Sequence, residues 1–443
     1  MNFQIRCCAY VALGVATACL PKVSQAQTAE LREGLEALFQ TAENHNATLQ
    51  SLRSALVEAE AGIKTARAEK LPDIEGQVSV SYLGNARLWN RHFGESTSAA
   101  MPHYGNNFFL GVNQVVYSGG AVTGGITLAE QAAEMSGLSE EEGRQNMHFL
   151  LTSLYLQLHN LKNREQVYAA NADLARNMIA LMQNRYEQGV SLHNDITRYE
   201  LQLQEMQLGQ TTMANGRSIV EHELYTALGT DSSEVKLLGE EAFSEGAVSI
   251  PIEADWQQLA VINHIGLKKS ELGVDMSRTQ EKLTFSEMLP KVALLAEDHL
   301  YGPITTEVPP INKNLHYWFV GVGVSYDFSS LYKSKKKVKQ SRLATTLAQD
   351  EHTVALQQVG DAVHAAYVDL GTARTELETR NKSVELAAEN YDVVSRRYQN
   401  GMALITDLTD AANIKLDAEL ALANARINFI YAYYNLKYVS GDL

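Results

Sequence analysis

Two kinds of hydrophobic pattern run along this 443-residue chain and predict two kinds of element. Apolar residues three and four positions apart recur through long segments, and this spacing is typical of helices that pack as coiled coils. Each series predicts a narrow seam against a neighbouring helix, and packing is the role expected of nearly all its residues. The clearest series are Leu151, Leu154, Leu158 and Leu161; Ile196, Tyr199, Leu203 and Met206; and Val384, Ala387, Tyr391, Val394 and Tyr398.

Strict alternation of apolar and polar residues predicts strands in two other regions. Residues 74–82 and 318–328 place apolar side chains on one face and small or polar ones on the other, for about ten positions, which is typical of membrane barrel strands. Two partner strands are expected nearby, and the polar segments 84–106 and 301–315 are expected to be loops. The four predicted strands are 73–83, 108–117, 291–300 and 317–328.

The number of strands bears on assembly. Alternation by itself also fits strands that pack on a soluble core. Four strands, however, are too few to close a barrel, and unpaired strand edges are not tolerated in lipid. Strands in a membrane would therefore have to be pooled from several chains, so the pattern predicts an oligomer.

Proline positions delimit the helices. After residue 26 the prolines fall in only three neighbourhoods, at 72–102, 251 and 290–310. Proline inside a helix costs about 3 kcal/mol, so continuous helix is expected in the long intervals from Gly120 to Gly189 and from Tyr332 to Gly401. Each could span roughly 100 Å at 1.5 Å per residue. Four glycines weaken the first prediction near its start: Gly124, Gly125, Gly137 and Gly143.

A long repeat organises the whole chain. Arg185-Tyr186-x2-Gly189-x5-Asp195 recurs as Arg397-Tyr398-x2-Gly401-x5-Asp407, and in each copy another glycine follows 40 residues after the first, at Gly229 and Gly441. A period above 200 residues is too long for a solenoid unit, so two similar halves are expected to build one object. The predicted division is 1–26 signal peptide, 27–229 first half, 230–254 linker and 255–443 second half.

The N-terminus predicts export. Arg6, an apolar run from Cys8 to Leu20 and the small-residue site Ser24-Gln25-Ala26 are typical of a secretory signal peptide cut before Gln27. All three cysteines lie in this segment, so the mature chain would hold no disulfide. A lipoprotein signal acylated at Cys19 is the alternative. After Ala26 no run of 18 apolar residues exists, so no membrane-spanning helix is expected.

Charge and motif searches exclude several functions. The formal net charge of -15 becomes -17 when the signal peptide removes Arg6 and Lys22, which argues against nucleic acid or an anionic membrane surface as the main partner. The twelve histidines show no paired ligand spacing, and no Gly-Lys-Ser/Thr follows the glycine pairs at 119–120 and 124–125. No catalytic residue, cofactor or metal site is therefore expected.

Taken together, these features resemble the TolC-like outer-membrane efflux proteins, also called outer-membrane factors, over nearly the whole mature chain. The shared order is a signal peptide followed by two copies of helix, Leu-Pro, strand, loop, strand and long helical hairpin. The most specific matches are Gly401-Met402-Ala403-Leu404-Ile405-Thr406-Asp407-Leu408-Thr409-Asp410, then Glu419-Leu420-Ala421-Leu422-Ala423-Asn424-Ala425-Arg426, and the strand exit Tyr117-Ser118-Gly119-Gly120.

The resemblance implies a mainly α fold with membrane β. Duplicated long hairpins would form an α-barrel, and four strands per chain would contribute to a 12-stranded outer-membrane β-barrel in a homotrimer. Such proteins are not enzymes. They serve as exit ducts of tripartite efflux pumps or type I secretion systems, embedded in outer-membrane lipid, extending into the periplasm, and docked through a periplasmic adaptor to an inner-membrane transporter.

The resemblance also implies roles for residues at the two hairpin tips. Asp407 and Asp410 match an aspartate ring at the periplasmic constriction, where six carboxylates around a three-fold axis would attract cations. Tyr398 and Asp195 match a tether that holds the gate closed, although Ala403 stands where the family carries a tether arginine. Adaptor docking falls on the exposed tips, namely Gly189, Ser191, Leu192, Gly401 and Leu404.

Each of these residues also has a purely structural interpretation. Gly189 and Gly401 suit tight turns, and Asp195 and Asp407 suit the electropositive start of the next helix. Asp407 and Asp410 lie on one helix face, whereas the counterparts in the first half are Asp195 and Arg198. The chain could alternatively be a trimeric coiled-coil adhesin or periplasmic scaffold without transport, although neither would need a duplicated strand pair. The transported substrate is left open.

Overall fold

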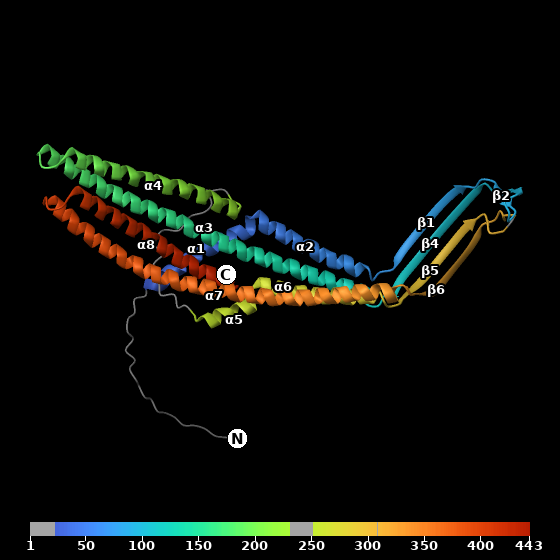
Figure 1. The fold of residues 1–443 in the computed structure, drawn as a ribbon. Helices are drawn as coiled ribbons and strands as arrows, with labels where there is room; N and C mark the ends of the chain where they lie inside the picture. The colour runs from blue at the N-terminus through green and yellow to red at the C-terminus, as the bar shows by residue number, and fades with distance from the viewer. Residues whose placement is uncertain (1–22, 231–250, 308) are drawn as a thin grey trace, which may run out of the picture.

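The computed structural model describes residues 23–230, 251–307 and 309–443, with the backbone alone for residues 23–33. The molecule is elongated, with long helices side by side along one axis and a β-sheet at one end (Figure 1). The first half contains α1 Val23–His45, α2 Ala47–Ala68, β1 Asp73–Tyr82, β2 Ala86–Trp89, β3 Ser96–Ala99, β4 Tyr104–Tyr117, α3 Ala121–Glu187 and α4 His193–Leu228. The second half contains α5 Glu253–Asn263, α6 Ile265–Ser286, β5 Lys291–Gly302, β6 Leu315–Ser325, α7 Ser330–Gln399 and α8 Ile405–Val439.

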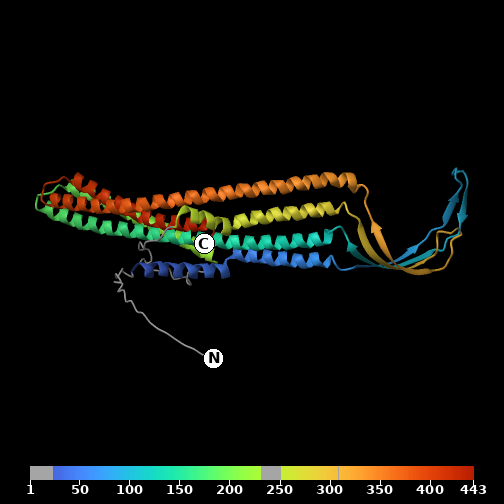
Figure 2. The same cartoon turned by 90° about the horizontal axis from the view of Figure 1, so that it is seen from below.

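Helices and strands follow the same lateral order. The main sheet is antiparallel in the order β1-β4-β5-β6, so β1 and β6 are its two edges. Beneath it, α2, α3, α6 and α7 lie next to one another in one layer, as Figure 2 shows. Because α2 leads into β1, β4 into α3, α6 into β5 and β6 into α7, each strand continues into one helix of this layer.

The long helices confirm the prediction from proline spacing. α3 has 67 residues and α7 has 70, and neither is interrupted. The expectation that glycines weaken the start of α3 was wrong, because two of them permit close packing. A Cβ at Gly124 would lie 2.7 Å from Leu283 on α6, and one at Gly143 would collide with Leu52 on α2. These glycines therefore set the spacing between α3 and its two neighbours in the layer.

The predicted helix seams are buried. Leu151, Leu154 and Leu158 belong to a core formed by the first four helices, with Leu161 packed against it. Tyr199, Tyr391 and Tyr398 belong to a second core, where α3 and α4 meet α7 and α8. A third core lies around Trp256, between α5, α7 and α8. The three- and four-residue spacing thus identified the packed faces correctly.

The two later glycines of the repeat end equivalent helices in the two halves. Gly229 has φ 71° and Gly441 has φ 73°, the left-handed conformation that glycine adopts without strain. A Cβ at Gly229 would lie 2.5 Å from the carbonyl oxygen of His45, and one at Gly441 would lie 2.9 Å from the carbonyl carbon of Asn263. Each glycine therefore lets a returning helix touch the junction between the two short helices that open its own half.

β4 and β5 are longer than the sequence suggested, whereas β1 ends one residue earlier, at Tyr82, and β6 is shifted toward its N-terminal end. β4 begins at Tyr104 rather than 108, and β5 continues to Gly302 rather than 300. β6 spans Leu315–Ser325 instead of 317–328, because Asp327 begins the turn into α7 by accepting a hydrogen bond from the Ser329 amide at 2.9 Å. Pairing with neighbouring strands extends β4, β5 and the start of β6 beyond the part where side chains alternate.

The segment predicted to be a loop at 84–106 holds a second, two-stranded sheet. β2 pairs with β3, from Ala86 opposite Ala99 to Trp89 opposite Ser96. Its turn is closed by Asn90, whose side-chain oxygen accepts hydrogen bonds from the amides of His92 at 3.2 Å and Gly94 at 2.9 Å. Strands of four residues are too short for alternation to reveal them.

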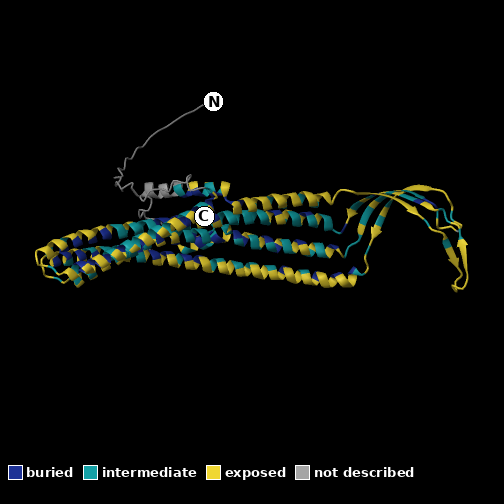
Figure 3. Ribbon diagram, turned by 90° about the horizontal axis from the view of Figure 1, so that it is seen from above, coloured by how far each residue is buried: buried dark blue, intermediate teal, exposed yellow. Residues whose placement is uncertain are grey.

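The main sheet has one apolar and one polar face. Large apolar side chains on the first face are strongly exposed, including Val80 at 77% and both Trp318 and Val320 at 71%. Figure 3 shows how much of the strand region lies uncovered by the rest of the chain. The pairing register puts the small and polar residues on the opposite face, among them Glu75, Gln77, Ser79, Asn107, Glu297, His299, Gly321 and Gly323. This division is typical of strands with lipid on one side and water on the other.

Some predictions concern residues outside the described part. Most of the predicted signal peptide, including Cys19, and most of the 230–254 linker lie there; α5 begins at Glu253, inside the predicted linker. Among the described residues, none of the helices combines the length and apolar character needed to cross a membrane.

Candidate functional site

The candidate site is the pair of hairpin tips at the end of the molecule opposite the sheet, where α3 turns into α4 and α7 turns into α8 (Figure 1). Both turns have the same backbone. Gly189 has φ 73° and Gly401 has φ 74°. The amide of each glycine donates to the tyrosine carbonyl three residues earlier, Tyr186 at 2.9 Å and Tyr398 at 3.0 Å. The repeated sequence motif therefore encodes one turn, used twice.

The acid that follows each turn sits at the start of the next helix but has different partners. In the second tip, Asp407 accepts a hydrogen bond from the Leu404 amide at 3.0 Å. In the first tip, Asp195 accepts one from the Ser191 hydroxyl at 3.3 Å. Negative charge is favoured at both positions by the helix dipole. Both acids therefore fit the structural interpretation, in which they stabilise the start of the next helix. A role in selectivity or gating would come in addition to this one.

Asp410 makes the second tip more acidic than the first. Asp407 and Asp410 are both exposed at the start of α8, one turn apart, whereas α4 carries Arg198 in the position of Asp410. The second tip thus presents two solvated carboxylates on one face of its helix. The first tip presents one acid and one base, whose fields largely cancel at a distance.

Tyr398 lies at the contact between the two hairpins. Its side chain is 6% exposed and belongs to the core that joins them. Burial raises the pKa of Tyr398, and the nearby Asp195 carboxylate raises it further, whereas Ser191 and Arg185 lower it. Among the described residues no group makes a hydrogen bond to its hydroxyl. The structure thus brings Tyr398 beside Ser191 and Asp195 without a hydrogen bond between them.

A cross-hairpin tether comes from a residue that the sequence analysis did not single out for this role. Arg185 on α3 donates from Nη1 to the Gln399 carbonyl at 2.6 Å and to the Tyr398 carbonyl at 3.3 Å. Its guanidinium also lies 5.8 Å from the centre of the Tyr398 ring. Arg185 therefore binds the carbonyl end of α7, where the helix dipole favours a cation. Ala403, at the position of the absent arginine, packs against the core instead.

A polar network ties the hairpins together farther from the tips. Asn171 on α3 donates to the Glu419 carboxylate on α8 at 2.6 Å, and Lys415 pairs with the same carboxylate at 2.7 Å. Gln202 on α4 donates to Asn413 on α8 at 2.8 Å. These half-buried contacts hold α8 against the first hairpin at two heights, so the tips are the ends of a cross-braced bundle.

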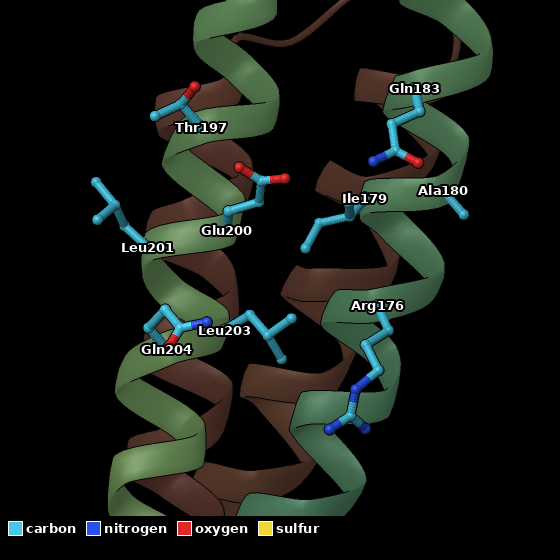
Figure 4. Close-up of a pocket in the computed structure, with 9 residues that line it drawn as sticks. All are labelled: Arg176, Ile179, Ala180, Gln183, Thr197, Glu200, Leu201, Leu203 and Gln204. Atoms are coloured by element: carbon cyan, nitrogen blue, oxygen red, sulfur yellow. The ribbon is translucent and has the colours of Figure 1, made fainter.

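The tips also offer exposed apolar side chains, and a groove lies farther along the first hairpin. Leu192 is 70% exposed and Leu404 is 69% exposed. A groove of about 480 Å³ runs between α3 and α4 behind the first tip. In Figure 4, Ile179 and Leu203 point into the groove, and Arg176 and Glu200 stand along it. Among the described residues no group of three or more His, Cys, Asp or Glu side chains is arranged to hold a metal ion.

Comparison with known proteins gives one family. The family model described as "Outer membrane efflux protein" matches residues 38–230 and 256–442. The chain is 21% identical to the outer membrane protein TolC of Escherichia coli over 441 residues, which cover 98% of this chain and 86% of TolC. It is 20% identical to the outer membrane efflux protein BepC of Brucella suis over 420 residues, which cover 94% of this chain and 87% of BepC.

Solved structures show the same fold. The outer-membrane channel OprN aligns with a TM-score of 0.78 at 15% identity, covering 96% of this chain and 93% of OprN. The CmeC outer membrane channel of Campylobacter jejuni aligns with a TM-score of 0.77 at 14% identity, covering 100% of this chain and 94% of CmeC.

Proposed function

Because the chain belongs to the outer membrane efflux protein family and is an outer-membrane protein, we propose that it forms a trimeric exit duct that is closed at its hairpin tips. In this assembly the sheets of three chains complete a 12-stranded barrel, and the helical layers continue it as a tunnel through the periplasm. The duct catalyses no reaction. An adaptor and an inner-membrane transporter open it for a tripartite efflux pump or a type I secretion system.

The observation that carries the proposal is an incomplete wall. The apolar face of the sheet is exposed, while β1 and β6, the outermost of the described strands, each have an unpaired edge. Lipid does not tolerate such edges, and the matching order of strands and helices lets added copies extend both layers at once. Exposed aromatic residues stand near both ends of the sheet, Tyr82 and Tyr104 at one end and Phe328 and Tyr332 near the other, as expected at membrane interfaces.

Planar bilayer recording tests this function. The purified protein should be trimeric in detergent and should insert as discrete conducting units. A trimeric adhesin or scaffold would give trimers without conductance, so that outcome would favour the alternative. A monomer in detergent under conditions that preserve the fold would contradict the proposed assembly itself.

We propose that Asp407 and Asp410 form the selectivity ring of the closed aperture. Three copies would bring six exposed carboxylates to the axis, which would attract cations and repel anions. The first hairpin would contribute no comparable charge because Arg198 offsets Asp195. Support for this role comes from the exposure of both acids at the tip and from the resemblance of this segment to the family motif.

The gate tether is proposed to have two parts. Tyr398 beside Asp195 is the part that the family resemblance implies. Arg185, through its bonds to the end of α7, supplies a second part in place of the arginine absent at Ala403. Opening would move the second hairpin away from the first, so it would have to break the contacts of Arg185.

Docking of the adaptor is proposed at the tips, on Gly189, Ser191, Leu192, Gly401 and Leu404. Two exposed leucines beside tight turns suit a helical hairpin partner. Cysteine introduced as Leu404→Cys should cross-link to an adaptor, with Leu208→Cys, 62% exposed on α4 away from the tip, as the control. All native cysteines lie in the predicted signal peptide, so no other thiol would compete. Equal cross-linking at both positions would contradict docking at the tip.

A further inference from the structure

A cluster of aromatic rings around one carboxylate lies on the polar face of the sheet, in the half of the strands away from the helices. It is built by Phe109 on β4, Glu297 and His299 on β5, and Tyr317 and Phe319 on β6. In the register of the sheet, Phe109 and Tyr317 flank His299 directly, and Phe319 lies opposite Glu297. Three adjacent strands therefore contribute to one patch.

His299, packed between two other rings, holds the carboxylate in place. His299 stacks on Tyr317 with ring centres 4.9 Å apart and planes 12° apart, and its centre lies 5.0 Å from that of Phe109. It donates from Nε2 to the Glu297 carboxylate at 2.8 Å. Glu297 is thus fixed among aromatic rings rather than extended freely into water.

Gly111 makes room for this arrangement. It lies opposite Glu297 on β4, and a Cβ there would be 2.6 Å from the tip of the Phe109 ring. Only glycine therefore lets that ring lie over the backbone next to the carboxylate. Tyr317 and Phe319 each remain 41% exposed, so part of each ring is open to the solvent on this face.

The charge of this face leaves Glu297 available to a ligand. In the four strands of the main sheet Lys291 is the sole lysine or arginine, and it lies six residues before Glu297. Asp73 and Glu75 share the polar face, and Glu75 lies in the same row as Gly111 and Glu297. The face is therefore acidic, and no lysine or arginine of these strands lies beside Glu297.

We propose that this patch is a binding site for organic ammonium ions. A carboxylate flanked by exposed aromatic faces combines charge attraction with cation–π contact, and both favour a bulky, weakly hydrated cation over K⁺. The site rests on the proposed function for its place on the inner wall of the barrel, where a trimer would carry three copies. Organic cations leaving the duct would contact it before release.

Tetrabutylammonium is the probe for the test. Added to the extracellular side of single trimers in planar bilayers, it should reduce K⁺ current in a saturable way, whereas hexanesulfonate should not. Glu297→Gln and the double variant Tyr317→Leu with Phe319→Leu should each weaken the block about three- to tenfold. Asp298→Asn is the matched control, because Asp298 is the next residue, lies on the opposite face and pairs there with His316 at 2.7 Å. It should leave the block unchanged.

The outcomes separate this site from the proposed duct. Conducting trimers without block, or equal block in Glu297→Gln and wild type, would overturn the site and leave the duct standing. If the block disappears only in the double variant Asp407→Asn with Asp410→Asn, the cation binds at the tips, and this outcome would also overturn the site at Glu297. If the trimers do not conduct, saturation-transfer NMR on solubilised trimer decides: tetrabutylammonium signals that depend on Glu297 support the site, and their absence refutes it.

Discussion

The two hairpin tips have the same backbone but different chemistry. Gly189 and Gly401 have nearly identical φ angles, and the two turns share the same amide to carbonyl bonds. The first tip, however, projects Arg185 onto the end of the other hairpin, whereas the equivalent Arg397 is exposed. The second tip carries the extra acid Asp410 where the first has Arg198. The two halves thus share one turn while their side chains differ: the first tip supplies an arginine to the other hairpin, and the second carries the extra acid.

The largest effect is expected from removing charge at one tip only. We expect Asp407→Asn with Asp410→Asn to lower the permeability of the trimer to K⁺ relative to Cl⁻ about fivefold or more, because six carboxylates would leave the aperture. Reversal potentials in a salt gradient measure it. Asp195→Asn with Arg198→Gln is the matched change at the other tip and should have little effect, because it removes one acid and one base whose fields largely cancel. Equal losses in both variants would remove the proposed difference between the tips.

The next effect concerns the two repeat arginines. Arg185→Ala removes hydrogen bonds from a charged donor, each worth about 1.5 to 3 kcal/mol, so the open fraction of the gate should rise about tenfold or more. Arg397→Ala should change it little, and Arg185→Lys should restore part of the closure. Basal conductance and detergent sensitivity report the open fraction. A larger effect of Arg397→Ala would show that the assignment of the tether is reversed.

Glycine substitution should affect both tips equally. A Cβ added at either Gly189 or Gly401 would have no neighbour within 4 Å. Alanine would therefore lower the free energy of unfolding only by the strain of the left-handed backbone, about 1 kcal/mol at each position. Gly229→Ala should cost more, because its Cβ would also meet the His45 carbonyl. Thermal unfolding of the solubilised trimers gives the ranking. A clear difference between the two tip variants would mean that one turn is strained by contacts of its own.

The smallest effect is expected at the repeat tyrosines. Tyr398→Phe should raise the open fraction at most about two- to threefold, because no described residue makes a hydrogen bond to this hydroxyl and only its proximity to Asp195 is lost. Tyr186→Phe, at the exposed equivalent, should be silent. If Tyr398→Phe matched Arg185→Ala in basal conductance, the tyrosine would be the principal tether.

The elements that could be predicted from the sequence are those that periodicity and local turn chemistry determine. The buried seams through Leu151 and Tyr391 and the four main strands follow from repeats of three to four and of two residues. The β2–β3 hairpin was missed because four residues carry no reliable period. Arg185 was recognised only as a mark of the repeat, because its partners are backbone carbonyls 213 and 214 residues away that no side-chain motif reveals. Contacts between the halves depend on their packing, and the repeat alone does not specify it.

One strand above one helix constrains the slope of the strands. Packed helices need roughly 8 to 10 Å of wall each, whereas strands are about 4.8 Å apart perpendicular to their direction. If each strand takes up the same width of wall as the helix that it continues into, the strands must be inclined roughly 55° to 60° from the long axis. Figure 1 shows them oblique to the helices. At that slope each residue adds only about 1.7 to 1.9 Å of height. The 12 residues of β5 thus rise about 20 to 23 Å, close to the roughly 25 Å apolar band of an outer membrane barrel. In the proposed duct, the length of a strand would thereby match the width of the helical wall to the thickness of the bilayer.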